Sequence, residues 1–317
     1  MASQSQLNES VPSPPQSIAQ GRELVGPDSI TVVVPTLNER EGIGIILDEL
    51  LKEGFKNVIV VDGYSTDGTA EIAGSKGAIV MQQLGTGKAG AIRTAVEAIS
   101  TPYVLIMDGD TTYRAEDIYR LLKYASSYDE VIGARTTGRK NIPLINRFGN
   151  RMISMLFKLL FDQPVTDVLS GMYLVKTDKL REMQITSSSF DVEVEIACTI
   201  AASGSITQVP IDYRERVGKQ KLSPGSAGRI LSTLFWMANY YNPVLIYGII
   251  GSLAAIPAIV ILGWTAYEAL FPKHWHSGYA IFGAMLLLLA SQAAAVSMVS
   301  VLIKRSESRL MRRLRLK

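Results

Sequence analysis

The sequence predicts an α/β fold, a mostly parallel sheet with helices on both faces, followed by a C-terminal hairpin of two transmembrane helices. In the first half of the chain, short apolar runs typical of buried strands alternate with amphipathic helical segments. The connections between them are short, which favours a parallel sheet with right-handed crossovers. Two long stretches without any charge lie near the C-terminus.

Length and charge limit the class of protein. The chain has 317 residues and a formal net charge of +3. The last stretch, 304–317, carries seven basic residues and one acid, so it contributes +6 and the remainder of the chain carries −3. Because the basic character is local, we expect no nucleic-acid partner. The single cysteine, Cys198, excludes an intramolecular disulfide and a cysteine metal cluster.

The order of elements follows from the apolar pattern. Residues 1–28 are rich in Ser, Gln and Pro and contain no apolar run, so we expect them to be disordered. The first strand is expected to stop at Pro35, and Asn38 is a plausible N-cap of the helix that follows. The pattern predicts strands at 30–35, 57–61, 78–81, 104–107, 130–135, 172–175 and 206–211, and helices after residues 38, 68, 88, 113, 146, 190 and 229.

Polar side chains follow three of these strands, at the point where each strand ends. Their positions are Asn38 and Glu39, then Asp62 and Asp67, then Asp108 and Asp110. The carboxyl ends of parallel strands meet at one edge of a sheet, where ligands bind. Two acids separated by one glycine can hold a hard divalent cation such as Mg²⁺ through oxygen ligands. Asp-x-Asp alone is equally typical of a solvated turn, and it is the convergence of strand ends that favours a metal site.

A glycine-rich loop at 85–90 leads into a helix and contains Lys88. Its spacing fits neither a Walker A loop nor a dinucleotide fingerprint. A helix N-terminus with a lysine suits an anion, although an exposed lysine in a turn explains the pattern equally well.

Basic residues gather in three places, around 135–140, 147–151 and 214–221. The second lies on an apolar helix that ends near residue 161, and the sequence leaves open whether this helix lies in a membrane interface or in a core. A carboxylate metal site indicates a diphosphate-bearing substrate. Basic clusters beside amphipathic helices indicate a second phosphate at a membrane surface.

The C-terminal part predicts membrane insertion. Residues 243–267 and 278–303 carry no charge, and each stretch exceeds the roughly 20 residues that a span needs. An amphipathic interfacial helix is expected at 224–242, and a basic tail at 304–317. Basic residues flank the outer ends of the hairpin, whereas the connection contains only Lys273. The positive-inside rule therefore predicts a multi-pass protein of the cell membrane with the large domain and both termini in the cytoplasm.

Four motifs, in the usual order and with the usual separations, resemble those of the GT-A glycosyltransferases of family 2. They are Pro35-x-x-Asn38-Glu39, Asp62 with Ser65-x-Asp67-Gly68-Thr69, Asp108-x-Asp110, and Ser170-Gly171. The resemblance covers about residues 30–223, so a GT-A domain is expected at 29–223. Arg135, the Arg147–Arg151 helix and the Gly218-x-x-Lys221-Leu222 loop are similar to those of polyprenyl-phosphate hexose synthases, namely dolichyl-phosphate mannose synthase and dolichyl- or undecaprenyl-phosphate glucosyltransferases.

The resemblance implies an inverting hexosyltransferase, with GDP-mannose or UDP-glucose as donor and a polyprenyl or dolichyl phosphate as acceptor. The further partners it implies are a lipid bilayer and, in a homo-oligomer, a second copy of the chain. It implies that Mg²⁺ or Mn²⁺ binds to Asp108 and Asp110. The implied donor-binding residues are Pro35, Asn38, Glu39, Asp62, Asp67, Lys88 and Asp108. The implied catalytic residues are Asp110 and the acceptor-phosphate arginines Arg135, Arg147, Arg151 and Arg216.

The sequence departs from the family pattern at three points. The family usually has Asp-Asp-Gly-Ser where this chain has Asp62-Gly63-Tyr64-Ser65. Mannose synthases often have Gln where Thr112 stands, so Thr112 weakens the mannose assignment and leaves the third metal contact open. The basic loop is one residue shorter than usual, so Arg214 could replace Arg216. Alternatives are a family 2 enzyme that acts on a lipid-diphosphate-linked sugar or a polysaccharide, and a membrane adaptor without catalytic activity.

Overall fold

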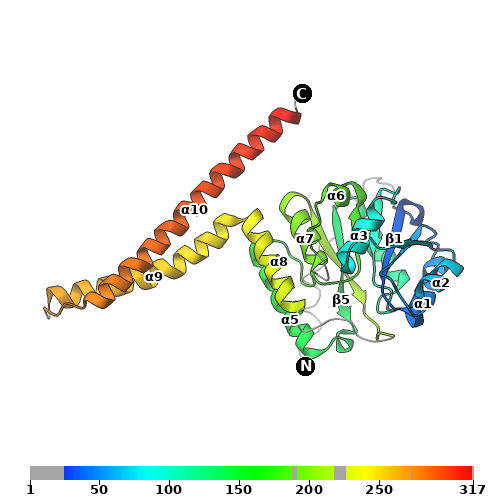
Figure 1. Cartoon of the computed structure of the whole chain (residues 1–317), viewed down its shortest axis with the longest axis horizontal. Coiled ribbons are helices and arrows are strands. Elements are labelled where there is room, and N and C mark those ends of the chain that lie inside the picture. The colour runs from blue at the N-terminus through cyan, green and yellow to red at the C-terminus, as the bar shows by residue number, and fades with distance from the viewer. Residues whose placement is uncertain (1–24, 188–190, 218–225, 272, 316–317) are drawn as a thin grey trace. The chain divides into compact units, whose positions relative to one another are not determined.

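The computed structural model describes residues 25–187, 191–217, 226–271 and 273–315 (Figure 1). Of the segment predicted to be disordered, 1–28, residues 1–24 lie outside the described residues, as does the predicted loop at 218–222. Residues 27 and 28 belong to the 3₁₀ turn Pro27–Ser29, which the prediction did not include. Contacts divide the chain into two compact units, 1–237 and 238–317. Each unit is described by itself.

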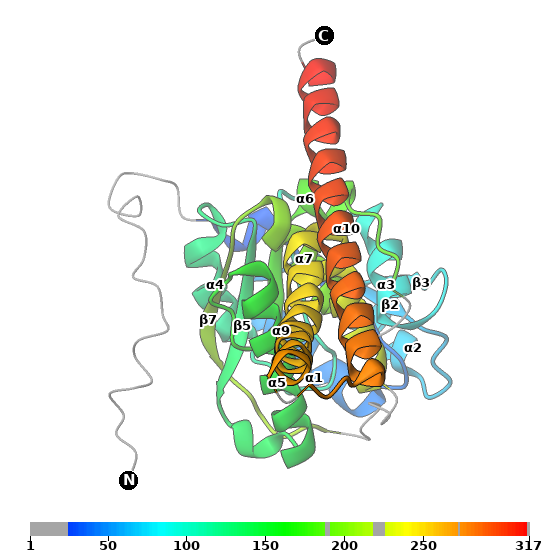
Figure 2. The same ribbon diagram turned by 90° about the vertical axis from the view of Figure 1, so that its left-hand side faces the viewer.

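The first unit is built on a seven-stranded sheet with the order β3-β2-β1-β4-β6-β5-β7. Figure 2 shows β3 and β7 at opposite edges of this sheet. Strand β6 runs antiparallel to both β4 and β5, and the other pairs are parallel, so the predicted mostly parallel sheet is confirmed. The strands are β1 (Ile30–Thr36), β2 (Val58–Asp62), β3 (Ile79–Gln82), β4 (Tyr103–Ile106), β5 (Glu130–Thr137), β6 (Tyr173–Lys176) and β7 (Ile206–Asp212).

Helices connect these strands, as the alternating pattern predicted. The helix predicted after residue 113 begins as a 3₁₀ turn, and α6 has no counterpart in the prediction. The helices are α1 (Arg40–Lys52), α2 (Thr69–Ser75), α3 (Gly87–Val96), α4 (Ile118–Ala125), α5 (Leu144–Phe161), α6 (Thr177–Glu182), α7 (Val192–Ser203) and α8 (Ser226–Tyr241), with 3₁₀ turns η3 (Pro27–Ser29), η4 (Ala115–Asp117) and η5 (Arg139–Asn141).

Both faces of the sheet are buried. Val32 and Val34 of β1 belong to the core that also contains Ile43 of α1 and Leu121 of α4. The residue between them, Val33, points to the opposite face because side chains alternate along a strand, and it is equally buried. Burial on two faces explains why the strands appear in the sequence as continuous apolar runs.

The first strand does not stop at Pro35 as predicted. Pro35 pairs with Val61 of β2, and β1 continues to Thr36. The backbone of Val33 faces β4, because its carbonyl accepts from the N–H of Met107, and position 35 faces the same side. Strand β4 has already ended there, so the N–H that proline lacks costs no ladder hydrogen bond.

Asn38 is not the N-cap of the first helix, which is a correction to the prediction. Its φ of 52° is left-handed, and the N-cap position belongs to Glu39. The helix N-terminus is satisfied by the loop after β2 instead. The N–H of Glu39 donates to the hydroxyl of Thr69 at 2.9 Å, and the N–H of Arg40 donates to Asp67 at 3.1 Å.

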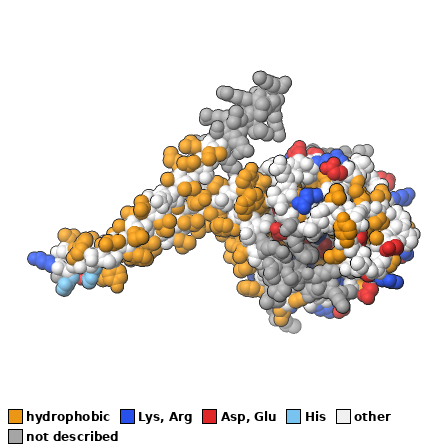
Figure 3. Space-filling view, viewed as in Figure 1, with side chains coloured by type: hydrophobic (Ala, Val, Ile, Leu, Met, Phe, Trp, Pro, Cys, Tyr) orange, Lys and Arg blue, Asp and Glu red, His pale blue; other side chains and the backbone are white. Residues whose placement is uncertain are grey.

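The second unit contains a helical hairpin, as predicted. Helices α9 (Pro243–Leu270) and α10 (Ser277–Arg315) lie side by side (Figures 1 and 2). A Cβ on Gly283 would lie only 2.8 Å from Leu262 Cγ, so a glycine allows this close packing. Both helices are long and apolar enough to cross a membrane, and only 17% and 6% of their most apolar windows are buried. The surface of the hairpin is mostly hydrophobic, with a basic side chain and both histidines at the end that joins the helices (Figure 3).

Candidate active site

The carboxyl ends of the parallel strands form one edge of the sheet, where the predicted residues gather. The chain leaves β1 towards β2 and β3 on one side and returns to β4 on the other, so the switch point of the sheet, beside which ligands bind in such folds, lies between β1 and β4. Gly109 lies at this point. A Cβ there would approach Val34 Cγ1 to 3.1 Å, and a Cβ on Gly42 would approach the Gly109 carbonyl to 2.7 Å. Two glycines thus allow α1 and the Asp108–Asp110 segment to pack together.

Asp110 is buried, and hydrogen bonds fix its orientation. Its Oδ1 accepts from the hydroxyl of Thr112 at 2.5 Å and from the N–H of Thr112 at 3.2 Å. Its Oδ2 lies 3.2 Å from Nη1 of Arg216. Burial, together with the nearby charge of Asp108, raises the pKa of Asp110. Thr112, where the family often has Gln, therefore positions the carboxylate of Asp110.

Lys88 forms a buried ionic cluster with two acids. Its Nζ donates to Asp108 Oδ1 at 2.6 Å and to Glu193 Oε1 at 2.7 Å. Burial alone would lower the pKa of Lys88, but the charges of Asp108 and Glu193 outweigh it and raise this pKa. Glu195 lies two residues further on and accepts from Thr186 and Ser187 instead. Glu193 and Glu195, which are two residues apart, therefore face different sides of the helix.

The loops after β1 and β2 are joined by hydrogen bonds. The N–H of Asn38 donates to Ser65 Oγ at 2.8 Å, and Asn38 Oδ1 accepts from the N–H of Thr66 at 2.8 Å. Asp62 is buried. Its Oδ2 accepts from the N–H of Ser65 at 2.9 Å, whereas its Oδ1 has no hydrogen-bond partner among the described residues.

The carboxylate of Asp67 is held by hydrogen bonds from neighbouring residues. It accepts hydrogen bonds from Thr69 and from the N–H of Arg40. These bonds outweigh the effect of burial and lower the pKa of Asp67. Asp67 thus caps the start of α1. Pro35, another predicted donor-binding residue, is half-buried near the end of β1.

The two acids at the switch point, Asp108 and Asp110, fit a divalent cation that is shared with a substrate. The described residues contain no group of three or more His, Cys, Asp or Glu side chains placed to hold a metal. Mg²⁺ is commonly held by one or two carboxylates together with substrate phosphates, and it keeps waters in its other positions. Asp108 and Asp110 supply two carboxylates of this kind, and the Asp108 side chain is 35% exposed.

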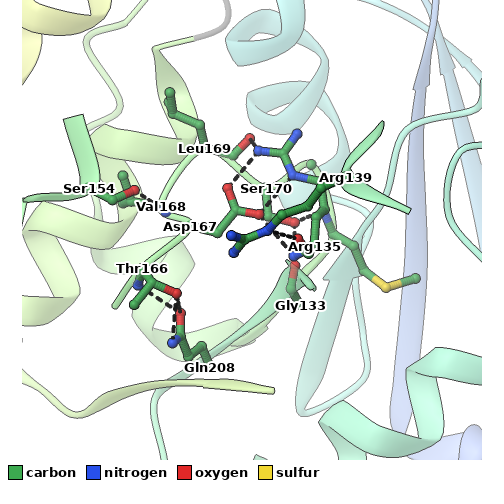
Figure 4. Close-up of polar contacts among 12 residues, drawn as sticks. Gly133, Arg135, Arg139, Ser154, Thr166, Asp167, Val168, Leu169, Ser170 and Gln208 are labelled. Atoms are coloured by element: carbon green, nitrogen blue, oxygen red, sulfur yellow. Dashed lines mark hydrogen bonds and ion pairs between the residues drawn. The ribbon is translucent and has the colours of Figure 1, made fainter. Parts of the chain in front are cut away.

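Arg135 is buried and tightly bound to Asp167 (Figure 4). Its Nε and Nη2 donate to the two carboxylate oxygens at 2.8 and 2.6 Å, and its N–H donates to Oδ2 at 2.9 Å. Nη2 also donates to the carbonyl of Leu169 at 3.0 Å. Ser170 Oγ donates to the carbonyl of Gly133 at 2.5 Å, so the segment 167–170 is fixed to β5 at both ends.

The other predicted arginines differ in their surroundings. Arg216 Nη2 donates to Glu39 at 2.8 Å, so Arg216 contacts both Glu39, a predicted donor-binding residue, and Asp110, a predicted metal ligand. Arg214 is instead bound by both its terminal nitrogens to Glu49 of α1, at 2.7 and 2.9 Å. Arg147 and Arg151 lie on α5, and within the described part of the chain neither has an acid within ion-pair distance.

Two comparisons establish the family. The sequence model described as "Glycosyl transferase family 2" matches residues 31–183. "Glycosyltransferase AglJ" of Haloferax volcanii is 35% identical over 285 residues, which cover 87% of this chain and 94% of that protein. The chain belongs to glycosyl transferase family 2. It is a glycosyltransferase, and the family resemblance predicted from its motifs is confirmed.

Further likenesses support this family 2 glycosyltransferase and its GT-A fold. A "Dolichyl-phosphate hexose transferase" of Haloferax volcanii is 35% identical over 206 residues, covering 63% of this chain and 90% of that protein. Glucosyl-3-phosphoglycerate synthase of Mycobacterium tuberculosis, crystallised with Mn²⁺, uridine diphosphate and glucosyl-3-phosphoglycerate, has a TM-score of 0.56 at 20% identity. That likeness covers 69% of this chain and 86% of the crystallised one, and it shows a shared fold.

Sequence reasoning missed two residues of the site in this family 2 enzyme. Glu193, the partner of Lys88, is not among the predicted site residues. Asp167, the partner of Arg135, is not among them either, although an acid three residues before Ser170-Gly171 was a signal that could have identified it.

Proposed function

We propose that this enzyme transfers a hexose from a nucleotide sugar, GDP-mannose or UDP-glucose, to a polyprenyl or dolichyl phosphate, with inversion at the anomeric carbon. The observation that carries the proposal is the pair Asp108 and Asp110 at the sheet edge, with Arg216 bound to Asp110. An acid suited to a cation on a diphosphate is thus in direct contact with a guanidinium that can bind a phosphate. The name of the dolichyl-phosphate hexose transferase relative supports the same acceptor class.

The donor would lie across the ends of β1, β2 and β4. Asp62, Asn38 and Glu39 would contact the nucleoside, and Lys88 would face the donor beside Asp108. Asp108 and Asp110 would hold Mg²⁺ or Mn²⁺, which when bound supplies positive charge against the departing nucleoside diphosphate. Lys88, which also binds Glu193, keeps the carboxylate of Asp108 in one orientation, because its Nζ lies 2.6 Å from Asp108 Oδ1.

The acceptor is a phosphate monoester that is largely dianionic at neutral pH, since its second pKa is about 6. Its oxygen attacks the anomeric carbon without a general base, and direct attack inverts that centre. The enzyme must therefore align two anions that repel each other. Arg147 and Arg151 would bind the acceptor phosphate first, because no acid among the described residues pairs with them, and Arg216 would complete the site. Arg135 would act by fixing the segment that carries Ser170 and Gly171.

Helix α5 supports a place for the acceptor at a membrane surface. Ile153, Phe157 and Leu160 are buried against the domain. The opposite side exposes large apolar side chains at helical spacing, namely Leu144, Phe148, Met152, Met155 and Leu159. The buried side agrees with the core alternative that the sequence left open, and the exposed apolar side supports the interface alternative. A bare apolar stripe beside Arg151 and Lys158 suits the headgroup region of a bilayer.

The hairpin of α9 and α10 supports a multi-pass membrane protein. We infer from the distribution of Lys and Arg that the catalytic domain and both termini are cytoplasmic. The lipid phosphate would then be reached from the cytoplasmic leaflet, where nucleotide sugars are present.

Transfer by the full-length protein in detergent tests the proposal. Radiolabelled GDP-mannose, UDP-glucose and UDP-N-acetylglucosamine are each offered with polyprenyl phosphate, or with a lipid-diphosphate-linked sugar. We expect one donor to label polyprenyl phosphate, in a reaction that EDTA stops. Asp110→Asn should lower turnover by more than about 100-fold, whereas Asp48→Asn, at an exposed ion pair with Lys76, should leave it unchanged. Label that enters only the lipid-diphosphate acceptor, or none in a folded protein, would refute the assignment.

A further inference from the structure

Tyr64 combines an unfavourable backbone conformation with an exposed ring. It has a φ of 65°, in the left-handed region, and its relative exposure is 64%. An aromatic side chain is rarely found there because its Cβ crowds the backbone. Such strain persists where the surroundings enforce it, and it concentrates at functional sites. The motif that the sequence resembles has glycine at this position, and glycine adopts this φ without strain.

The residues on either side of Tyr64 enforce the conformation. The N–H of Gly63 donates to the carbonyl of Thr36 at 2.8 Å, and a Cβ on Gly63 would lie 3.1 Å from that carbonyl and from Gln83 Oε1. Ser65 is held by its N–H to Asp62 and by its hydroxyl to the N–H of Asn38. Within the described residues the Tyr64 side chain itself has no hydrogen bond, ion pair or ring contact.

Tyr64 lies two residues after a buried acceptor. Asp62 is 2% exposed, and its Oδ1 has no hydrogen-bond partner among the described residues. Asp62 ends β2, and it pairs with Thr36 at the end of β1. A carboxylate oxygen can accept an N–H from the edge of a base, and an aromatic ring can cover the face of the same base. The two residues provide both parts of a nucleobase site.

We propose that Tyr64 is a further donor-binding residue, whose ring stacks on the nucleobase of the donor. The inference rests on the proposed function, because it needs a nucleotide at the ends of β1 and β2, where Asp62 would contact the nucleoside. It adds that the affinity for the nucleotide depends on an exposed ring held in a strained backbone conformation. Because every base has a π-face, the ring serves uracil and guanine alike.

Calorimetry on the full-length protein in detergent with Mg²⁺ tests this inference. The probes are UDP, GDP and inorganic pyrophosphate, which lacks a base. Base–aromatic stacking predicts that Tyr64→Ala and Tyr64→Gly weaken the preferred nucleotide by about tenfold. Tyr64→Phe keeps the ring and should stay within about twofold. Pyrophosphate affinity should be unchanged in all three variants, and Tyr64→Gly should melt no lower than the wild type because glycine adopts this φ without strain.

The outcomes separate the two proposals. A wild-type protein that binds pyrophosphate but neither UDP nor GDP would overturn the proposed function and this inference with it. Nucleotide binding that Tyr64→Gly leaves unchanged would overturn the inference alone. Equal losses for nucleotide and pyrophosphate would also overturn it, because Tyr64 would then support the shape of the loop rather than contact a base.

Discussion

Removing the negative charge of Asp167 should destabilise the domain strongly. Arg135 and Asp167 are 7% and 6% exposed, and three hydrogen bonds from Arg135 reach the Asp167 carboxylate. Burial alone would lower the pKa of Arg135, but Asp167 outweighs this effect and raises it. An arginine does not release its proton in a protein, so Asp167→Asn leaves a buried cation without its counter-charge.

The expected size of the effect follows from that geometry. Removing one partner of a buried ion pair costs about 3–5 kcal/mol. Because Asn keeps one acceptor oxygen, we expect a loss near the lower limit, about 3 kcal/mol. For a domain of this size, such a loss lowers the melting temperature by roughly 6–12 °C. The measurement is thermal unfolding of the full-length protein in detergent, followed by near-UV circular dichroism.

Two controls make the result interpretable. Asp48→Asn removes an exposed ion pair with Lys76, whose side chains are 58% and 39% exposed, and should change stability by less than about 0.5 kcal/mol. Replacing both Arg135 and Asp167 by leucine should recover most of the stability, because no buried charge then remains. A shift for Asp167→Asn no larger than that of Asp48→Asn would refute the reasoning and would leave Arg135 available to bind the acceptor directly.

Three further predictions concern other parts of the domain. Glu193→Gln should lower turnover by about tenfold or more, because the partner of Lys88 loses its charge. The control Glu195→Gln should lower the melting temperature and keep turnover, and equal turnover losses in the two variants would contradict this prediction. Glu130 is fully buried, which raises its pKa well above the ordinary value, so the folded wild type loses stability as pH rises from about 4.3 through the folded pKa. Melting curves at pH 5 and 8 should show the stability of Glu130→Gln relative to the wild type increasing with pH, and a constant difference would count against the shift. Met155→Ser should weaken binding of the domain without its hairpin to anionic vesicles, whereas Leu51→Ser, at an exposed leucine of α1, should not.

The sequence was sufficient for features that depend on local periodicity. Buried strands produce apolar runs, and acids such as Asp62 and Asp108 directly follow them, so the common edge of the sheet could be predicted before any coordinate was known. The helical hairpin could be predicted for the same reason, because its length and lack of charge are properties of single segments.

Pairings between distant side chains could not be predicted. Arg135 and Asp167 are 32 residues apart, and neither spacing nor composition indicates that they meet. Arg214 and Arg216 lie on one loop with the same chemistry, yet one binds Glu49 and the other binds Glu39. Which acid each arginine reaches depends on the packing of the loop against α1, a tertiary property that local sequence does not contain.

Arg216 links the two halves of the proposed site. Its two terminal nitrogens bind Glu39 and Asp110, which belong to the proposed donor side, whereas its own proposed ligand is the acceptor phosphate. When the acceptor phosphate draws the guanidinium away from the two carboxylates, their negative charge is no longer neutralised, and they attract the cation of the donor more strongly. When that cation binds the carboxylates first, they hold the guanidinium less strongly, and it can bind the phosphate. Donor and acceptor should therefore affect each other's affinity through Arg216. Since such coupling is reciprocal, the factor by which donor tightens acceptor binding must equal the factor by which acceptor tightens donor binding. Arg216→Gln should bring both factors towards one together.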